Sequence, residues 1–95
     1  MYTILAEVHI EDLNRFLAVF TTDGLAKRAR HGSLGAEVLA ATEDNDRVFV
    51  LIDWSDCAAF NAFLADPEVG PTMARGGAKG RPSFTPVTRQ GRLAA

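Results

Sequence analysis

Two stretches of the chain carry the same pattern, a strand of apolar residues followed directly by an amphipathic helix. In residues 2–10 apolar side chains occupy alternate positions, which predicts a strand with one apolar and one mixed face. Residues 13–20 then place apolar side chains at i, i+3, i+4 and i+7, the spacing of one helical face. The apolar run at 47–54 and the helical segment at 55–65 repeat this order. The chain therefore contains the same strand–helix unit twice.

A shift of 44 residues superimposes the two units, so that Asp12 meets Asp56 and Phe16 meets Phe60. Glu11 and Asp12 can cap the start of the first helix, with both carboxylates near the positive end of the helix dipole. The second helix is predicted to start near Ser55 or Asp56. Cys57 takes the place of Leu13 in this repeat, which predicts a small core residue. The alternative for Cys57 is a thiol whose pKa is lowered by the helix N-terminus.

The segments between and after the two units complete the order β-α-β-β-α-β. A second short helix is predicted from Asp23 to His31, before a strand at 34–42. The polar turn at 43–46 connects this strand to the run at 47–54, which predicts an antiparallel hairpin. Another short helix follows Asp66 and ends near residue 75. The last strand is predicted at 83–88, where Pro86 cannot donate a hydrogen bond to a neighbouring strand, so this strand should lie at the edge of the sheet or carry a bulge.

Two intercalated β-α-β halves form the ferredoxin-like fold, an α+β arrangement with a four-stranded antiparallel sheet and helices on one face. In the predicted strand order 4-1-3-2, the strands at 2–10 and 47–54 are central, adjacent and parallel. Residues 1–89 form this single domain and residues 90–95 form a flexible C-terminal tail. The face without helices carries apolar side chains, which predicts a homodimer that packs sheet against sheet. These side chains are Leu5, Leu39, Phe49 and Leu51.

The composition excludes several classes of protein. The net charge of −2 argues against a general nucleic-acid binder. A single cysteine allows neither an internal disulfide nor a cysteine-based metal site. No apolar run approaches the roughly 18 residues that span a bilayer, and the first residues carry no basic region of a secretory signal. We therefore expect a cytoplasmic protein that binds neither nucleic acid nor membrane.

The mixed face of the sheet carries the best candidates for chemistry. In the predicted register, His9 lies beside Asp53 on neighbouring strands, and Glu37 lies opposite Asp53. A histidine oriented by a carboxylate can act as a general base near neutral pH. The alternative is structural, because charged residues near strand ends often meet solvent or pair across an interface.

Other residues are weaker candidates for contact with a ligand. Glu7 and Phe49 share the mixed face with His9. Trp54 ends the buried strand and Asn61 lies in the following helix, and each has a plain alternative, as a core residue and as a solvated residue respectively. The glycine-rich segment at 75–81 is either a mobile lid or a solvated loop. No histidine or cysteine spacing indicates a metal site.

Several stretches together resemble one known family. These are Val8-His-Ile-Glu-Asp-Leu-Asn-Arg-Phe-Leu-Ala-Val-Phe20, Asp53-Trp-Ser-Asp56, Ala65-Asp-Pro67 and Gly80-Arg-Pro82. The chain resembles the antibiotic biosynthesis monooxygenase-like proteins of the dimeric α+β barrel superfamily, some of which are labelled cyclases. The resemblance implies a homodimer with a pocket in each subunit between sheet and helices. Some members of the family oxidise polyketide quinols or anthrones with O2 and without a cofactor, and others cyclise polyketides or degrade haem.

The resemblance also implies a pocket to which an asparagine and a tryptophan contribute, and Asn61 and Trp54 are of the right types. The residues and the resemblance together predict a small-molecule enzyme acting on an aromatic or polyketide-like substrate, as a cofactor-independent monooxygenase or a cyclase. His9 would be the base, Asp53 would orient it and Glu37 would tune its electrostatics, with no cofactor. The alternatives are a non-catalytic ligand-binding or accessory homodimer of the same fold, and a stress-associated domain without a small-molecule role.

Overall fold

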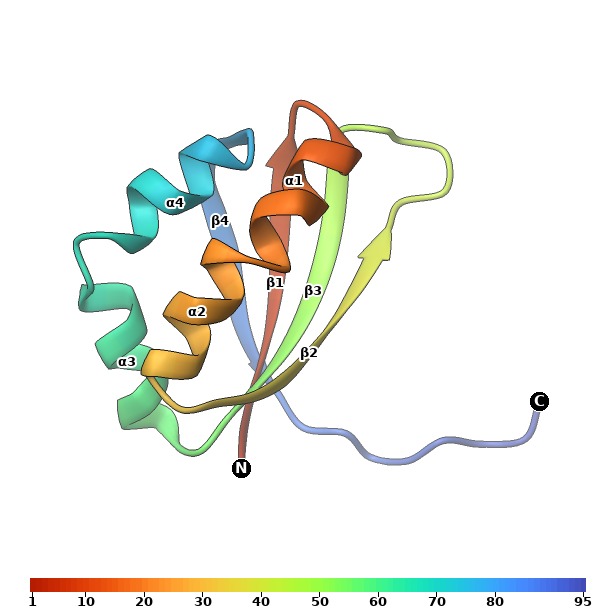
Figure 1. Cartoon of the computed structure of the whole chain (residues 1–95). Helices are drawn as coiled ribbons and strands as arrows, with labels where there is room; N and C mark the ends of the chain where they lie inside the picture. The colour runs from red at the N-terminus through yellow and green to blue at the C-terminus, as the bar shows by residue number, and fades with distance from the viewer.

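A computed structural model describes residues 1–95 and contains four strands and four helices. The elements are β1 (Tyr2–Ile10), α1 (Leu13–Phe20), α2 (Asp23–Arg30), β2 (Ser33–Ala40), β3 (Arg47–Trp54), α3 (Cys57–Ala65), α4 (Val69–Arg75) and β4 (Ala78–Val87). The strands form one sheet in the order β2-β3-β1-β4, and the helices cover one of its faces (Figure 1). This is the predicted ferredoxin-like fold, with a pair of helices in each crossover. None of the helices is long and apolar enough to span a membrane.

All neighbouring strands of the sheet are antiparallel, so the predicted parallel pairing of the two central strands is wrong. In the register of β1 and β3, Thr3 lies opposite Asp53 and His9 lies opposite Arg47. The reason is the direction in which each connection leaves the chain. Helices α1 and α2 connect β1 to β2 in a crossover, so β2 runs parallel to β1. The β2–β3 hairpin then reverses the chain, so β3 runs antiparallel to β1.

The two halves of the repeat begin their helices in the same way. Asp12 caps α1 by accepting a 2.8 Å hydrogen bond from the backbone N–H of Arg15. Asp56 caps α3 by accepting a 2.8 Å hydrogen bond from the backbone N–H of Ala59. Each cap satisfies one of the N–H groups that a helix N-terminus leaves free. The predicted cap of the first helix is therefore confirmed at Asp12, and the second half of the repeat carries the same cap at Asp56.

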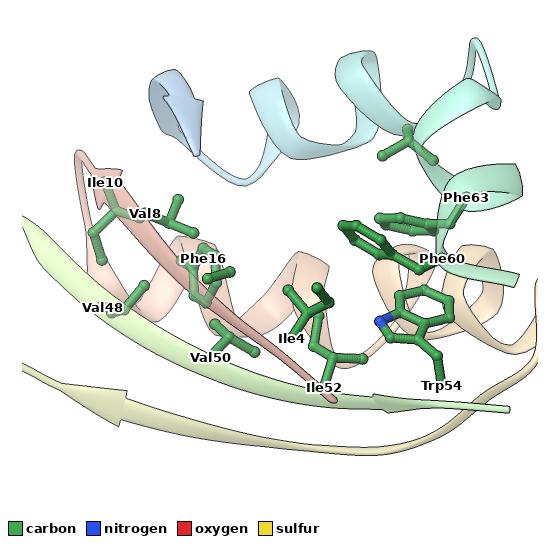
Figure 2. Close-up of a cluster of buried hydrophobic side chains, with 12 residues drawn as sticks. Ile4, Val8, Ile10, Phe16, Val48, Val50, Ile52, Trp54, Phe60 and Phe63 are labelled. Atoms are coloured by element: carbon green, nitrogen blue, oxygen red, sulfur yellow. The ribbon is translucent and has the colours of Figure 1, made fainter. Parts of the chain in front are cut away.

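The core lies between the sheet and the helices. Alternate residues of β1 and β3 point toward the helices, and twelve buried side chains form a single cluster (Figure 2). The tryptophan at the end of β3, Trp54, is fully buried against Phe60 and Phe63 of α3, with ring centroids 5.7 and 4.9 Å away. Trp54 is thus a core residue, which is the alternative that the sequence offers to contact with a ligand.

The last strand begins earlier than predicted. β4 starts at Ala78, and Ala78 and Lys79, which belong to the segment predicted as a mobile lid or a solvated loop, pair with Ile10 and His9 at the end of β1. An irregularity between Glu7 and His9 takes up extra residues of β4, and Gly80 adopts a φ of 70° there. A left-handed φ of this kind favours glycine and is typical of a bulge. Pro86 lies on this edge strand, as predicted.

Candidate functional site

A cavity of about 70 Å³ lies between the helix-covered face of the sheet and helices α1, α2 and α4. Its floor consists of apolar side chains of the central strands, including Ala6 and Val8 of β1 and Val50 and Ile52 of β3. Concave, mostly apolar spaces with a few polar groups are the usual form of small-molecule sites. The cavity is therefore the first candidate for a binding site in this fold.

A second, wider cleft of about 280 Å³ lies beside the cavity, between α4 and β4. Three side chains line both spaces, Val69 and Met73 of α4 and Phe84 of β4. These three side chains form the wall between the cavity and the cleft. Met73 and Phe84 are only partly buried, so a change in the rotamers of these side chains, without a movement of the backbone, would join the two spaces.

Arg28 is the polar residue that distinguishes the cavity. It lies on α2 with only 5% of its surface exposed, although arginine is rarely buried without a partner. Its Nη2 donates a 3.0 Å hydrogen bond to the backbone oxygen of Phe20, and its guanidinium carbon lies 3.7 Å from the centre of the Phe20 ring. Its Nε has no hydrogen-bond partner. Burial lowers the pKa of Arg28 to about 10, so the side chain stays charged at neutral pH.

The other polar residues that line the cavity already have partners. Thr72 is buried and donates a 2.8 Å hydrogen bond from Oγ1 to the backbone oxygen of Glu68. The Nζ of Lys27 lies 2.9 Å from the Glu68 carboxylate. Arg28 is therefore the charged group in the cavity wall that has no acidic partner, and its Nε has no hydrogen-bond partner at all.

The predicted row of His9, Asp53 and Glu37 does not form. His9 lies opposite Arg47 at one end of β1, and Asp53 lies opposite Thr3 at the other end. Six residues of β1 separate these positions, which at about 3.3 Å per residue is roughly 20 Å. Glu37 lies opposite Leu51, not opposite Asp53. The misplacement of His9 follows from the parallel pairing assumed for the central strands. Glu37 is misplaced because the β2–β3 hairpin pairs two residues away from the predicted register.

Asp53 and Glu37 are instead connected by an arginine that follows β4. The Nη1 of Arg89 lies 2.9 Å from Oδ1 of Asp53, and its Nη2 lies 3.6 Å from Glu37. The hydrogen bond from Arg89, together with that from Thr3, lowers the pKa of the Asp53 carboxyl. These groups lie on the face of the sheet away from the helices. Their predicted catalytic roles stay predictions, and none of them lines the cavity.

The predicted ligand contacts are similarly scattered. Glu7 lies 3.7 Å from Arg47 on the open face of the sheet, which also carries Phe49. Asn61 is exposed on α3, where its Nδ2 lies 3.6 Å from the Sγ of Cys57. Cys57 is itself exposed, so the prediction of a small core residue is wrong. The first residue of α3 turns toward solvent, whereas Leu13 of α1 packs against the core.

The histidine that meets a carboxylate is His31. Its Nε2 lies 2.8 Å from Oδ2 of Asp66, at the point where the end of α2 meets the end of α3. The hydrogen bond from His31 is the main cause that lowers the pKa of Asp66, followed by the backbone N–H of Glu68. No sequence pattern indicates this pair, because both residues lie at helix ends 35 residues apart.

Comparison with protein-family models gives one match, to the antibiotic biosynthesis monooxygenase model, over residues 1–75. The chain belongs to the antibiotic biosynthesis monooxygenase family. The match to the family model therefore covers β1 to α4, the elements that supply most of the cavity wall. A search of curated proteins finds no match.

Solved structures of antibiotic biosynthesis monooxygenase folds are similar to the whole chain. SnoaB, a cofactor-independent oxygenase from Streptomyces nogalater, has a TM-score of 0.75 at 19% identity, over 99% of this chain and 97% of SnoaB. A candidate antibiotic biosynthesis monooxygenase from Deinococcus radiodurans has a TM-score of 0.67 at 13% identity, over 100% and 98% of the two chains. At such identities the likeness shows a shared fold.

In this member of the antibiotic biosynthesis monooxygenase family, the cavity lies between sheet and helices, where the resemblance implies a pocket, but the sequence analysis did not predict its lining residues or the role of Arg28. One signal was available, since Phe20, Gly24 and Arg28 are spaced by four residues. That spacing places Gly24 and Arg28 on one face of α2, and this face lines the cavity. From the sequence alone, Arg28 in the last turn of a helix suits the negative end of the helix dipole, an interpretation that requires no cavity.

Proposed function

We propose that this protein is a cofactor-independent oxygenase that binds a small aromatic, polyketide-like substrate in the cavity between sheet and helices. The observation that carries the proposal is a half-open apolar cavity in a member of the antibiotic biosynthesis monooxygenase family. SnoaB, which has the same fold, is described as a cofactor-independent oxygenase and supports the same kind of chemistry.

An anthrone illustrates why such a reaction needs no cofactor. The methylene carbon of an anthrone becomes a carbonyl, one atom of O2 forms that carbonyl, and the other leaves as water with the two methylene hydrogens. The substrate supplies all four electrons that reduce O2. The protein then has to bind the ring, hold it away from bulk water and favour loss of the first proton.

The two neighbouring spaces suit a substrate larger than a single ring. The cavity of about 70 Å³ holds only a small group, and the cleft of about 280 Å³ beside it offers further room. We propose that one edge of the substrate enters the cavity and the rest lies in the cleft, past Met73 and Phe84. His9 lies on the other face of the sheet, so in this proposal the first proton does not go to His9.

We also propose that the protein works as a homodimer, formed through the open face of the sheet. Leu39 is 50% exposed on β2, and Leu51 and Phe49 of β3 lie beside it on the same face. Apolar residues in such a group favour an interface with a second copy. In the dimer, the cluster of Arg89, Asp53 and Glu37 would lie at this interface.

Oxygen uptake tests the proposed reaction. Purified protein treated with a chelator is mixed with anthrone, and O2 consumption and anthraquinone formation are followed together. We expect both to exceed the rate in buffer, with equal amounts of O2 consumed and anthraquinone formed. Anthrone binding without O2 uptake would favour the alternative, a non-catalytic ligand-binding dimer. Conversion of a polyketide-like substrate without O2 uptake would favour a cyclase.

A further inference from the structure

Arg28 is a buried cation that no carboxylate neutralises. It takes part in none of the ion pairs of the chain, whereas the neighbouring bases Lys27 and Arg30 both pair with Glu68. It is also the only lysine or arginine with less than a tenth of its surface exposed. Burial of an unpaired charge is costly, so such a group is a candidate for a functional role.

The position of the guanidinium is fixed by its surroundings. It lies against the Phe20 ring on one side, and one hydrogen bond to the Phe20 backbone oxygen holds its Nη2. Gly24 leaves room for it, since a Cβ at that position would lie 3.2 Å from Nη1 of Arg28 and 3.1 Å from the backbone oxygen of Val19. The head group is thus oriented before any ligand binds, which lowers the entropy that binding would cost.

The donors that remain suit an anion. Arginine has five N–H donors and no acceptor, and only one of its hydrogen bonds is used by the protein. The Nε is buried and has no partner, in the wall of a cavity whose other lining is mainly apolar. In such a poorly solvated site an ionised oxygen is bound more strongly than in water.

We propose that Arg28 binds an anionic oxygen of the ligand in the cavity, and that the ligand is an aromatic monoanion such as a phenolate, an enolate or a carboxylate. The inference deepens the proposed function and rests on it for the choice of the cavity as the site. It also gives the protein a means to ionise its substrate. A fixed cation beside a phenol or anthrone oxygen lowers the pKa of the substrate, and the resulting enolate is the electron-rich form that can react with O2.

Two small probes of the same shape test the assignment. Benzoate is a planar anion and benzamide is its neutral counterpart, and each is titrated into the full-length protein by calorimetry without any oxidation step. We expect wild-type protein to bind benzoate about tenfold more tightly than benzamide. Equal affinity for the two probes in the wild type would overturn the assignment without any variant.

Variants then locate the preference. Arg28→Gln should bind the two probes equally, and Arg28→Lys, which keeps the charge but not the planar fork, should keep part of the preference. The matched control is Arg30→Gln, which removes one charge from the exposed side of the same helix. A preference that survives Arg28→Gln, or that is lost equally in Arg30→Gln, would place the anion elsewhere. Circular dichroism checks that each variant is folded.

The outcome is independent of the oxygenase assay. Preference for benzoate without anthrone oxidation would keep Arg28 as an anion-binding residue and reject the proposed reaction. Anthrone oxidation without preference for benzoate would keep the reaction and reject the role of Arg28.

Discussion

The hydroxyl of Thr3 on β1 donates a 2.6 Å hydrogen bond to Oδ1 of Asp53 on β3. The two residues are directly opposite each other in the antiparallel pairing, near the end of β3. Arg89 binds the same carboxylate from the segment that follows β4. Asp53 therefore joins three parts of the chain, the start of β1, the end of β3 and the C-terminal segment.

Asp53→Asn removes the charge that holds Arg89 in place. Because Arg89 is nearly half-exposed, we expect only a modest loss of stability, about 0.5–1 kcal/mol in the free energy of unfolding. Residues 88–95 should also become more sensitive to limited proteolysis. Arg89→Gln should reproduce the faster cleavage, and unchanged cleavage in both variants would mean that the pair does not order the C-terminal segment.

Asp66 should make the stability of the protein sensitive to acid. Its pKa in the folded protein is lowered, chiefly by the hydrogen bond from His31, so its contribution is present above the pKa of the unfolded carboxyl, near 4. That contribution is lost as the pH falls through the lower folded pKa. We expect Tm to fall steeply below about pH 4, and Asp66→Asn to have a lower Tm at about pH 7 with a shallower fall in acid.

Thermal unfolding followed by circular dichroism between about pH 7 and about pH 2 measures this effect. His31→Ala should move the profile in the same direction as Asp66→Asn. If the acid dependence of both variants equals that of the wild type, the pair does not contribute as described. Asp53, Glu68 and Asp44 also have lowered pKa values, so part of the acid dependence will remain in any single variant.

Leu39→Glu tests the proposed dimer. A charge in the middle of an apolar interface is costly to bury, so the variant should be a folded monomer. Leu25→Glu is the matched control, because Leu25 is similarly exposed, at 53% against 50%, but lies on α2 on the helical side. Light scattering after size-exclusion chromatography gives the mass of each. A wild-type monomer, or a Leu39→Glu dimer, would contradict an interface on the open face.

Phe60→Ala should be among the most destabilising substitutions in the core. The Phe60 ring packs against Tyr2, Trp54 and Phe84, with centroids 6.2, 5.7 and 5.5 Å away. Loss of a buried phenylalanine costs about 3–5 kcal/mol in the free energy of unfolding. Asn61→Ala, at the next position of the same helix, is exposed and should change stability by less than about 0.5 kcal/mol. Urea unfolding followed by the single tryptophan, Trp54, compares the two variants.

The sequence predicted the fold well where local patterns decide the structure. The caps at Asp12 and Asp56 and the burial of Phe16 and Phe60 follow from periodicity within each repeat. The direction of β3 relative to β1 depends on how the whole chain reverses, and one wrong direction moved His9 away from Asp53. The residues that line the cavity could not be predicted for a similar reason, since elements from all parts of the chain form its wall, although the family resemblance implied a pocket between sheet and helices.

Arg28 shows a second limit of sequence reasoning. An arginine in the last turn of a helix suits the helix dipole, and that interpretation needs no tertiary contact. Only the packing of α2 against α1 and α4 buries this side chain while leaving Arg30 exposed. Burial of a charged residue is thus a property of the assembled fold, and the pattern of the chain alone does not show it.

Oxygen uptake by three forms of the protein tests most directly whether the substrate is oxidised on the helical side of the sheet. Ala6 lies on the cavity floor, so Ala6→Leu fills the space, whereas His9→Ala changes the opposite face. With anthrone and chelator-treated protein, we predict that Ala6→Leu lowers kcat/KM by about tenfold or more, while His9→Ala keeps a rate close to the wild type. Loss of activity in His9→Ala, with full activity in a folded Ala6→Leu, would contradict the account.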